Sequence, residues 1–290
     1  MTCRASSASS GLVNPTLQCP CDRSFDAPAF EYDAPPEGET RFALGEQPYR
    51  RSYARCLLCR HWYSDHAFDL TVLYGGDYAD HTYGNRLRQT YERILALPPE
   101  RSDNAGRVAR ILAYATARFG CERSPTLLDV GAGLGVFPAK MKGAGWACTA
   151  LDPDPRAAAH ARDVVGVTAV AGDFLAIDLR TLGRYDVITF NKVLEHVEDP
   201  IAMLARAAGL LAAGGFVYVE VPDADAAARE GPAREEFFIE HHHVFSAVSL
   251  AMMADRAGFA VESLERLREP STKFTLRAFL ASRGANESVG

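Results

Sequence analysis

Three glycines and a carboxylate occupy positions from which a protein can hold a nucleotide-like ligand. Gly131, Gly133 and Gly135 directly follow an apolar run and precede a helical pattern. Because glycine lacks a Cβ, its backbone can approach a ligand closely. Asp152 ends the next apolar run, where a carboxylate can accept hydrogen bonds from both ribose hydroxyls of an adenosine. Together these features indicate a site for an adenosine-containing ligand.

A second acid and an aromatic residue extend this site. Asp173 ends the third apolar run, and Phe174 follows it. The carboxylate can accept the exocyclic amine of adenine, while the neighbouring backbone or ring holds the base. Nicotinamide-binding folds usually have the pattern glycine, one residue, glycine, two residues, glycine. Counted from Gly131, the third glycine of that pattern would be at position 136, which is Val136 here. The simpler alternatives are that Asp152 starts a helix and that Asp173 belongs to a turn.

Alternating strands and helices must position these residues. Apolar strands separated by amphipathic helices predict an α/β fold, with a doubly wound, mostly parallel seven-stranded sheet covered on both faces. The carboxyl ends of such strands meet at one edge, where open parallel sheets bind ligands. The expected strands are 126–130, 147–151, 167–171, 185–190, 216–221, 260–267 and 273–281. The expected helices span about 83–97, 102–119, 156–164, 201–211 and 246–257.

These motifs, in their order and spacing, resemble the class I, Rossmann-like methyltransferases that use S-adenosylmethionine. The resemblance covers roughly residues 102–281. The resemblance rests on four motifs: LLDVGAGLG at 127–135, ALDPD at 150–154, AGDF at 171–174 and YDVITFNKVLEHVEDP at 185–200. It implies that Gly131 and Gly133 lie against the methionine part of the cofactor. It also implies that Asp152 binds the ribose and Asp173 meets the adenine.

The same resemblance gives roles to further residues. It implies that Asp129 supports the glycine loop and that Asn191 lies near the methionine ammonium group. Glu195 and His196 match a common pattern of the family, either as catalytic groups or simply as residues at a helix start.

Three consecutive histidines supply the candidates for catalysis. Methyl transfer is an in-line displacement at a sulfonium carbon, so much of the rate comes from positioning, and only some acceptors need a base. In an extended chain, His241 and His243 lie on one side and His242 on the other. We expect His243, and secondly His241, to act as base or acceptor-positioning group. The alternative is a polar loop in which Ser246 caps the next helix.

Four of the seven cysteines fall in two close pairs near the amino terminus. Cys56 and Cys59 have the spacing of half a zinc knuckle, whereas Cys19 and Cys21 are separated by one residue instead of two. We predict that all four hold a structural zinc ion, unless His61 or His66 substitutes for one of them. A metal-free remnant and a redox role are the alternatives. The arrangement resembles zinc modules that precede some methyltransferases of sugars, other small metabolites or ribosomal RNA.

Composition divides the chain into five predicted segments. They are a flexible tail at 1–17, the zinc-binding module at 18–66, a helical lid or linker at 67–101, the methyltransferase domain at 102–281 and a tail at 282–290. Tyr74, Tyr78 and Tyr83 lie in the lid segment. They either close over the cofactor or pack in the core or an interface.

Charge and hydropathy limit the expected partners. The net charge of −6 gives no overall attraction to polyphosphate. No stretch resembles a signal peptide or approaches the roughly 18 apolar residues of a membrane helix, so we expect a cytoplasmic protein. We expect a methyltransferase of a small-molecule metabolite, acting at oxygen, carbon or nitrogen. One alternative is a catalytically inactive cofactor-binding scaffold. The other is an RNA methyltransferase that presents an arginine-rich surface made of Arg41, Arg50, Arg51, Arg55 and Arg60.

Overall fold

A seven-stranded sheet forms the centre of the computed structural model, which describes residues 19–21, 26–42, 47–68 and 87–283. The strand order is β10-β11-β8-β7-β4-β5-β6, and β11 runs antiparallel to the other six strands. The strands are β4 (Thr126–Val130), β5 (Ala147–Asp152), β6 (Thr168–Ala171), β7 (Tyr185–Asn191), β8 (Leu211–Pro222), β10 (Phe259–Arg268) and β11 (Phe274–Ser282). The predicted doubly wound, mostly parallel sheet is therefore confirmed.

Helices cover both faces of this sheet because successive strand residues point to opposite sides. One core cluster packs α6 (Pro200–Ala207) and α8 (Ala247–Arg256) against the sheet. The other packs α2 (Leu87–Leu95), α3 (Asp103–Phe119) and α4 (Val136–Gly143) against the opposite face. The described residues also form the short helices α5 (Pro155–His160) and α7 (Ala224–Ala227). Within the described ranges, no helix is both long and apolar enough to span a bilayer.

Side-chain caps fix the starts of two helices where the sequence predicts them. Ser102 accepts a hydrogen bond from the Ala105 N–H and so begins α3. Ser246 forms a capping box with Ser249 and begins α8 directly after the histidine segment. The predicted helix at 156–164 is shorter as an α-helix, because α5 passes into a π-helical turn at Ala161–Val165.

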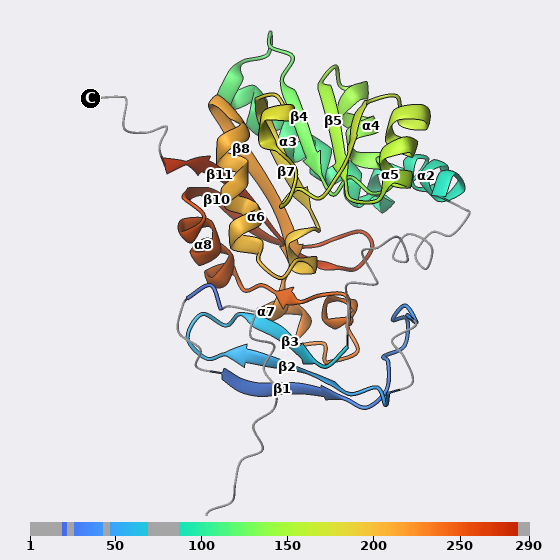
Figure 1. The fold of residues 1–290 in the computed structure, drawn as a ribbon, viewed down its shortest axis with the longest axis vertical. Helices are drawn as coiled ribbons and strands as arrows, with labels where there is room; N and C mark the ends of the chain where they lie inside the picture. Colours follow the sequence, from blue (N-terminus) through green and yellow to red (C-terminus); the bar gives the residue numbers. More distant parts are fainter. Residues whose placement is uncertain (1–18, 22–25, 43–46, 69–86, 284–290) are drawn as a thin grey trace, which may run out of the picture.

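A second, four-stranded sheet joins the amino-terminal segment to the histidine segment. Its order is β1 (Asp26–Tyr32), β2 (Arg51–Cys56), β3 (Trp62–His66) and β9 (His243–Val244). Figure 1 shows β1, β2 and β3 stacked at one end of the molecule, next to α7. Because β9 comes from a distant part of the chain, the amino-terminal segment packs directly on the larger fold. The predicted boundaries at 17, 66, 101 and 281 stay predictions, and the lid tyrosines Tyr74, Tyr78 and Tyr83 lie outside the described residues.

Candidate active site

A cavity of about 1080 Å³ opens at the carboxyl ends of β4, β5, β6 and β7. The glycine loop 131–135 lines it together with Asp152, Asp173 and Asn191. Sequence positions spread over some sixty residues of chain thus meet at one edge of the sheet, as expected for parallel strands. The cavity is large enough for a drug-sized ligand.

Asp152 ties the glycine loop to the end of β5. Its Oδ2 accepts a hydrogen bond of 2.7 Å from the Gly133 N–H, and its Oδ1 accepts one of 2.9 Å from the Asp154 N–H. Burial raises the pKa of this carboxyl, while the two backbone N–H groups lower it. Each carboxylate oxygen has a further lone pair, so Asp152 can still accept hydrogen bonds from a ligand. Asp154, in turn, caps α5 by accepting from the Arg156 N–H.

Two positions of the loop differ in the space that a side chain would find there. Gly131 and Gly133 both have positive φ, at 70° and 50°. A Cβ on Gly131 would lie 2.6 Å from Cγ2 of Val193, whereas a Cβ on Gly133 would meet no atom within 4 Å. Because Gly133 lines the cavity, the open volume next to its Cα is available to a ligand.

Asp129 holds Asn191 instead of the glycine loop. Its buried Oδ1 accepts hydrogen bonds from Thr189 Oγ1 at 2.7 Å and from Asn191 Nδ2 at 2.8 Å. Burial raises the pKa of this carboxyl to about 6. The bond fixes the Asn191 amide so that its buried Oδ1 has no hydrogen-bond partner among the described residues. That oxygen is an acceptor suited to a cationic group in the cavity.

Asp173 and Phe174 differ in their exposure. The exposed Asp173 carboxylate accepts a 2.9 Å hydrogen bond from the Leu175 N–H, as in a turn. The Phe174 ring is only 2% exposed and packs edge-on against Phe190, with ring centroids 5.8 Å apart. Little of the ring is available for stacking, so of the two predicted contacts to a base the geometry favours the backbone.

Glu195, His196 and His241 form a second group in the cavity lining. His196 Nδ1 lies 2.9 Å from the Glu240 carbonyl oxygen, and His241 Nδ1 lies 2.9 Å from that of Glu236. Burial lowers the pKa of His196 to about 4 and that of His241 well below its usual value, so both imidazoles are neutral near pH 7. Burial also raises the pKa of Glu195 to about 7. The sequence pattern pointed to Glu195 and His196 but not to their meeting with His241.

His243 does not share this position, which corrects the order of the two predicted histidines. It is absent from the cavity lining, and its ring lies between His61 Nε2, 2.9 Å from Nδ1, and the Glu198 carbonyl, 3.3 Å from Nε2. The expected alternation fails because His241 donates its N–H to Phe238 in a turn, and only His243–Val244 is strand. The geometry thus favours His241 over His243 as the residue that faces an acceptor.

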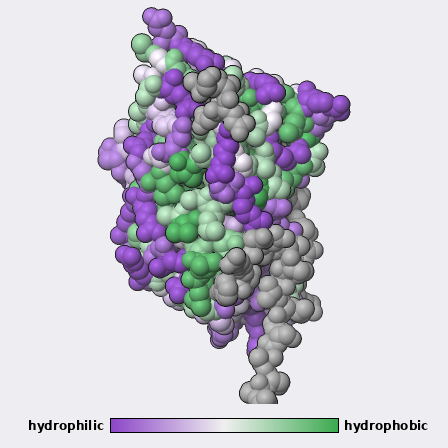
Figure 2. Space-filling model, turned by 90° about the vertical axis from the view of Figure 1, so that its left-hand side faces the viewer, coloured by the Kyte–Doolittle hydropathy of each residue, from purple (hydrophilic) through white to green (hydrophobic). Residues whose placement is uncertain are grey.

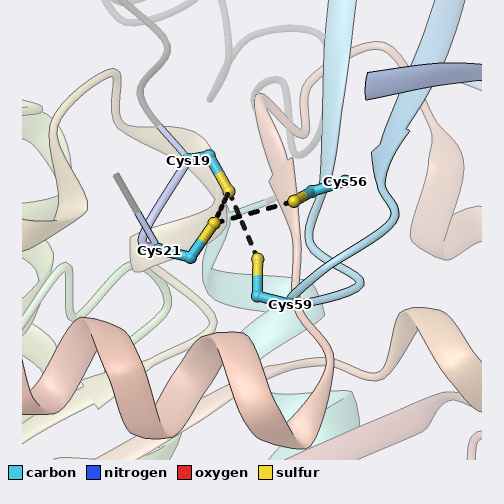
Figure 3. A group of neighbouring side chains, drawn as sticks. All are labelled: Cys19, Cys21, Cys56 and Cys59. Carbon is cyan, nitrogen blue, oxygen red and sulfur yellow. Dashed lines mark hydrogen bonds between the residues drawn. The ribbon is translucent and has the colours of Figure 1, made fainter. Parts of the chain in front are cut away.

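The four cysteines predicted to bind metal come together although Cys21 and Cys56 lie 35 positions apart in the chain (Figure 3). Cys19 Sγ lies 3.2 Å from Cys21 Sγ and from Cys59 Sγ, and Cys21 Sγ lies 3.7 Å from Cys56 Sγ. A tetrahedral zinc ion with Zn–S bonds of about 2.3 Å needs sulfurs roughly 3.8 Å apart, so the cluster needs only a small expansion to hold one. Four thiolates are a complete structural ligand set.

His61 links the region of the cysteine cluster to the histidine segment and, like His66, lies outside the group of four cysteines. His61 lies between His243 and Ser249, with nitrogen–partner distances of 2.9 and 3.2 Å. Ser246 Oγ donates a 2.6 Å hydrogen bond to the Cys59 carbonyl. The fold around the cysteines therefore supports the loop that carries His241.

A buried ionic network adjoins the cavity and was not predicted from the sequence. Glu220 on β8 accepts hydrogen bonds from Arg107 Nε at 2.9 Å and Arg277 Nε at 2.8 Å. Despite the cost of burial, these cations lower the pKa of Glu220 to about 2. Arg107 also reaches Asn104, and both residues line the cavity.

The predicted arginine-rich surface is incomplete in the structure. Arg51 is buried, pairs with Glu39 at 2.8 Å and lies over the Tyr32 ring. Arg60 pairs with Asp225 at 2.9 Å. Beside the cysteine cluster the surface is apolar: Leu57 and Leu58 are more than half exposed. Figure 2 shows hydrophobic side chains gathered on the face that lies on the left of Figure 1.

Known proteins share both the motifs and the architecture. A family model described as a methyltransferase domain matches residues 100–264, more than half of the chain. The chain belongs to this methyltransferase family. An alignment of 131 positions shows 37% identity to a ubiquinone biosynthesis O-methyltransferase of Caulobacter vibrioides and covers 40% of this chain and 51% of that methyltransferase. The chain thus spans about half the length of the curated methyltransferases that it matches.

Solved methyltransferase structures have the same fold at low sequence identity. Magnesium protoporphyrin IX methyltransferase from Synechocystis, with bound S-adenosylhomocysteine, gives a TM-score of 0.56 at 17% identity, covering 74% of this chain and all of that one. The 1,6-didemethyltoxoflavin-N1-methyltransferase of Burkholderia thailandensis gives 0.55 at 20% identity, covering 84% of this chain and 98% of that one. The fold is that of class I S-adenosylmethionine-dependent methyltransferases, with a cysteine cluster near its amino terminus.

Proposed function

We propose that this methyltransferase binds S-adenosylmethionine in the cavity at the strand ends and methylates a small-molecule acceptor. The observation that carries the proposal is Asp152, which ends β5, is hydrogen-bonded to Gly133 of the glycine loop and lines the cavity. A carboxylate fixed in this way is oriented for ribose hydroxyls before any ligand arrives. The curated relatives act, by their names, in ubiquinone biosynthesis, which supports a small-molecule acceptor here.

The other lining residues have complementary roles in the proposal. The open space above Gly133 accommodates the methionine part of the cofactor, and the Asn191 Oδ1 accepts a hydrogen bond from its ammonium group. Asp173 and the Phe174 backbone lie where the adenine would bind. The cofactor supplies a methyl group already activated by a sulfonium sulfur.

The acceptor then lies beside Glu195, His196 and His241. In the transfer, a bond from the acceptor to the methyl carbon would form as the carbon–sulfur bond breaks, S-adenosylhomocysteine would leave, and a proton that the acceptor carries would pass to water. We propose that His241 positions the acceptor, because its ring borders the cavity and its Nδ1 is fixed by a backbone carbonyl. His243 lies on the side of this loop away from the cavity, where its ring contacts His61 and so holds the loop in place.

The Asp152→Ala variant tests the cofactor assignment. We expect about a 100-fold weaker affinity for S-adenosylhomocysteine, because two hydrogen bonds to a charged carboxylate, each of about 1.5 kcal/mol, are lost. Isothermal titration calorimetry measures this change. Asp178→Ala is the matched control, since that aspartate caps the turn Leu179–Thr181 in the same way but lies outside the cavity lining, so it is expected to change the affinity little. Equal binding by wild type and Asp152→Ala would contradict the ribose assignment.

Gly133→Ala tests whether the open space above the loop belongs to the cofactor. The new methyl group meets no protein atom but enters the cavity, so we expect at least tenfold weaker S-adenosylhomocysteine binding. Gly145→Ala is the matched control, because Gly145 also has positive φ and open space but lies outside the cavity lining. Both variants carry a similar backbone strain of about 1–2 kcal/mol. Equal affinities of the two variants would show that the cofactor binds elsewhere.

A further inference from the structure

Glu195, His196 and His241 have the chemistry of a second metal site, separate from the cysteines. Each offers one ligand atom, and these atoms lie within 4.8 Å of one another. They come from two distant segments: Glu195 and His196 lie in the 3₁₀ turn Leu194–His196 after β7, and His241 lies in the loop before β9. All three line the cavity in which the acceptor is expected.

The histidine hydrogen bonds prepare both rings for a metal. A backbone carbonyl only accepts hydrogen bonds, so His196 Nδ1 and His241 Nδ1 each carry the proton that they donate to Glu240 and Glu236. The lone pair is then on Nε2 in both rings. Such bonds from Nδ1 to a carbonyl are the usual outer-shell interactions that orient metal-binding histidines. The two rings also lie close together, with centroids 4.8 Å apart.

Glu195 gives an independent indication that something is bound. Its side chain is 1% exposed, yet neither Oε1 nor Oε2 has a hydrogen-bond partner among the described residues. Leaving a buried carboxylate without a partner is costly. The neighbouring cation Lys192 instead donates its Nζ to Thr275 Oγ1 at 2.6 Å. The carboxylate therefore lacks a compensating cation at hydrogen-bond distance.

We propose that Glu195, His196 and His241 bind a first-row divalent transition-metal ion, such as Mn²⁺ or Fe²⁺, that holds a hydroxyl acceptor. Two imidazoles and one carboxylate suit such ions better than Mg²⁺ or Ca²⁺, which prefer oxygen ligands. Three protein ligands leave coordination positions for the acceptor oxygen and water. An ion held there would favour loss of the hydroxyl proton to water, which would leave the acceptor oxygen as the nucleophile. The inference rests on the proposed function and narrows the acceptor atom to oxygen.

Mn²⁺ titration followed by electron paramagnetic resonance tests this site, because Mn²⁺ favours nitrogen and oxygen ligands and avoids a cluster of four thiolates. In the full-length, zinc-loaded protein we expect about one Mn²⁺ to bind. Glu195→Gln and His241→Gln should each weaken this binding at least tenfold. Glu198→Gln is the matched control, because Glu198 lines the same cavity but lies outside the cluster, and it should bind Mn²⁺ as wild type does.

S-adenosylhomocysteine titration of the same samples separates this inference from the proposed function. Retained S-adenosylhomocysteine binding shows that each variant is folded. If wild type binds S-adenosylhomocysteine but no Mn²⁺, or if both variants bind Mn²⁺ as wild type does, the metal site is refuted and the proposed function stands. If wild type binds no S-adenosylhomocysteine, the proposed function itself fails.

Discussion

Replacing Cys56 by serine is expected to release the proposed zinc ion and lower the free energy of unfolding by about 4–5 kcal/mol, a loss typical of a structural metal. Cys56 ends β2, and its sulfur is one of four within a single tetrahedral volume. The buried cluster immediately around it consists of the four cysteines with Met252, so cross-linking by metal contributes much of the local stability. For a chain of this size the loss corresponds to a melting temperature lower by roughly 10 °C.

Elemental analysis and thermal unfolding measure the two effects of this substitution. Wild type should contain about one zinc ion per chain and the variant almost none. Cys148→Ser is the matched control, because Cys148 is also buried but lies on β5, away from the cluster, so zinc should be retained. Metal-free wild type with an unchanged melting temperature would contradict a structural zinc.

Glu220→Gln should lower the free energy of unfolding by about 3–5 kcal/mol, because it leaves the cations of Arg107 and Arg277 buried without their shared anion. Chemical denaturation at pH 7 measures this loss. Glu262→Gln is the control: its pair with Arg118 is partly exposed, and such pairs contribute about 0–1 kcal/mol.

The same variant has a defined pH dependence. The pKa of Glu220 is lowered to about 2 from an ordinary value of 4.5, so its charged form stabilises the folded state fully above pH 4.5. That contribution is lost as the pH falls towards 2. The difference between wild type and Glu220→Gln should therefore be constant above pH 5 and shrink below pH 4.5. A difference that grows on acidification would contradict the assigned network.

The sequence predicts the larger sheet well because its signals are local. Buried parallel strands appear as short apolar runs, and β4 spans the predicted residues 126–130. The edge positions of Asp152 and Asp173 follow from those runs alone. The cysteine cluster was also predictable, since thiol pairs are rare and distinctive.

Features that depend on contacts between distant segments were not predictable. The sheet of β1, β2, β3 and β9 pairs residues near 63 with residues near 243, and no local pattern contains that register. The same pairing fixes His243 in the interior and leaves His241 at the cavity. The network around Glu220 joins three elements, and each of its charges has the appearance of a surface residue in the sequence.

A crystal structure of the protein with S-adenosylhomocysteine tests the central claim most directly. We expect the ligand in the cavity at the ends of β4, β5 and β6, with both ribose hydroxyls within hydrogen-bond distance of the Asp152 carboxylate and the adenine beside Asp173. The sulfur of S-adenosylhomocysteine should point towards the cluster of Glu195, His196 and His241. A ligand bound outside this cavity, or inside it with the ribose away from Asp152, would contradict the account.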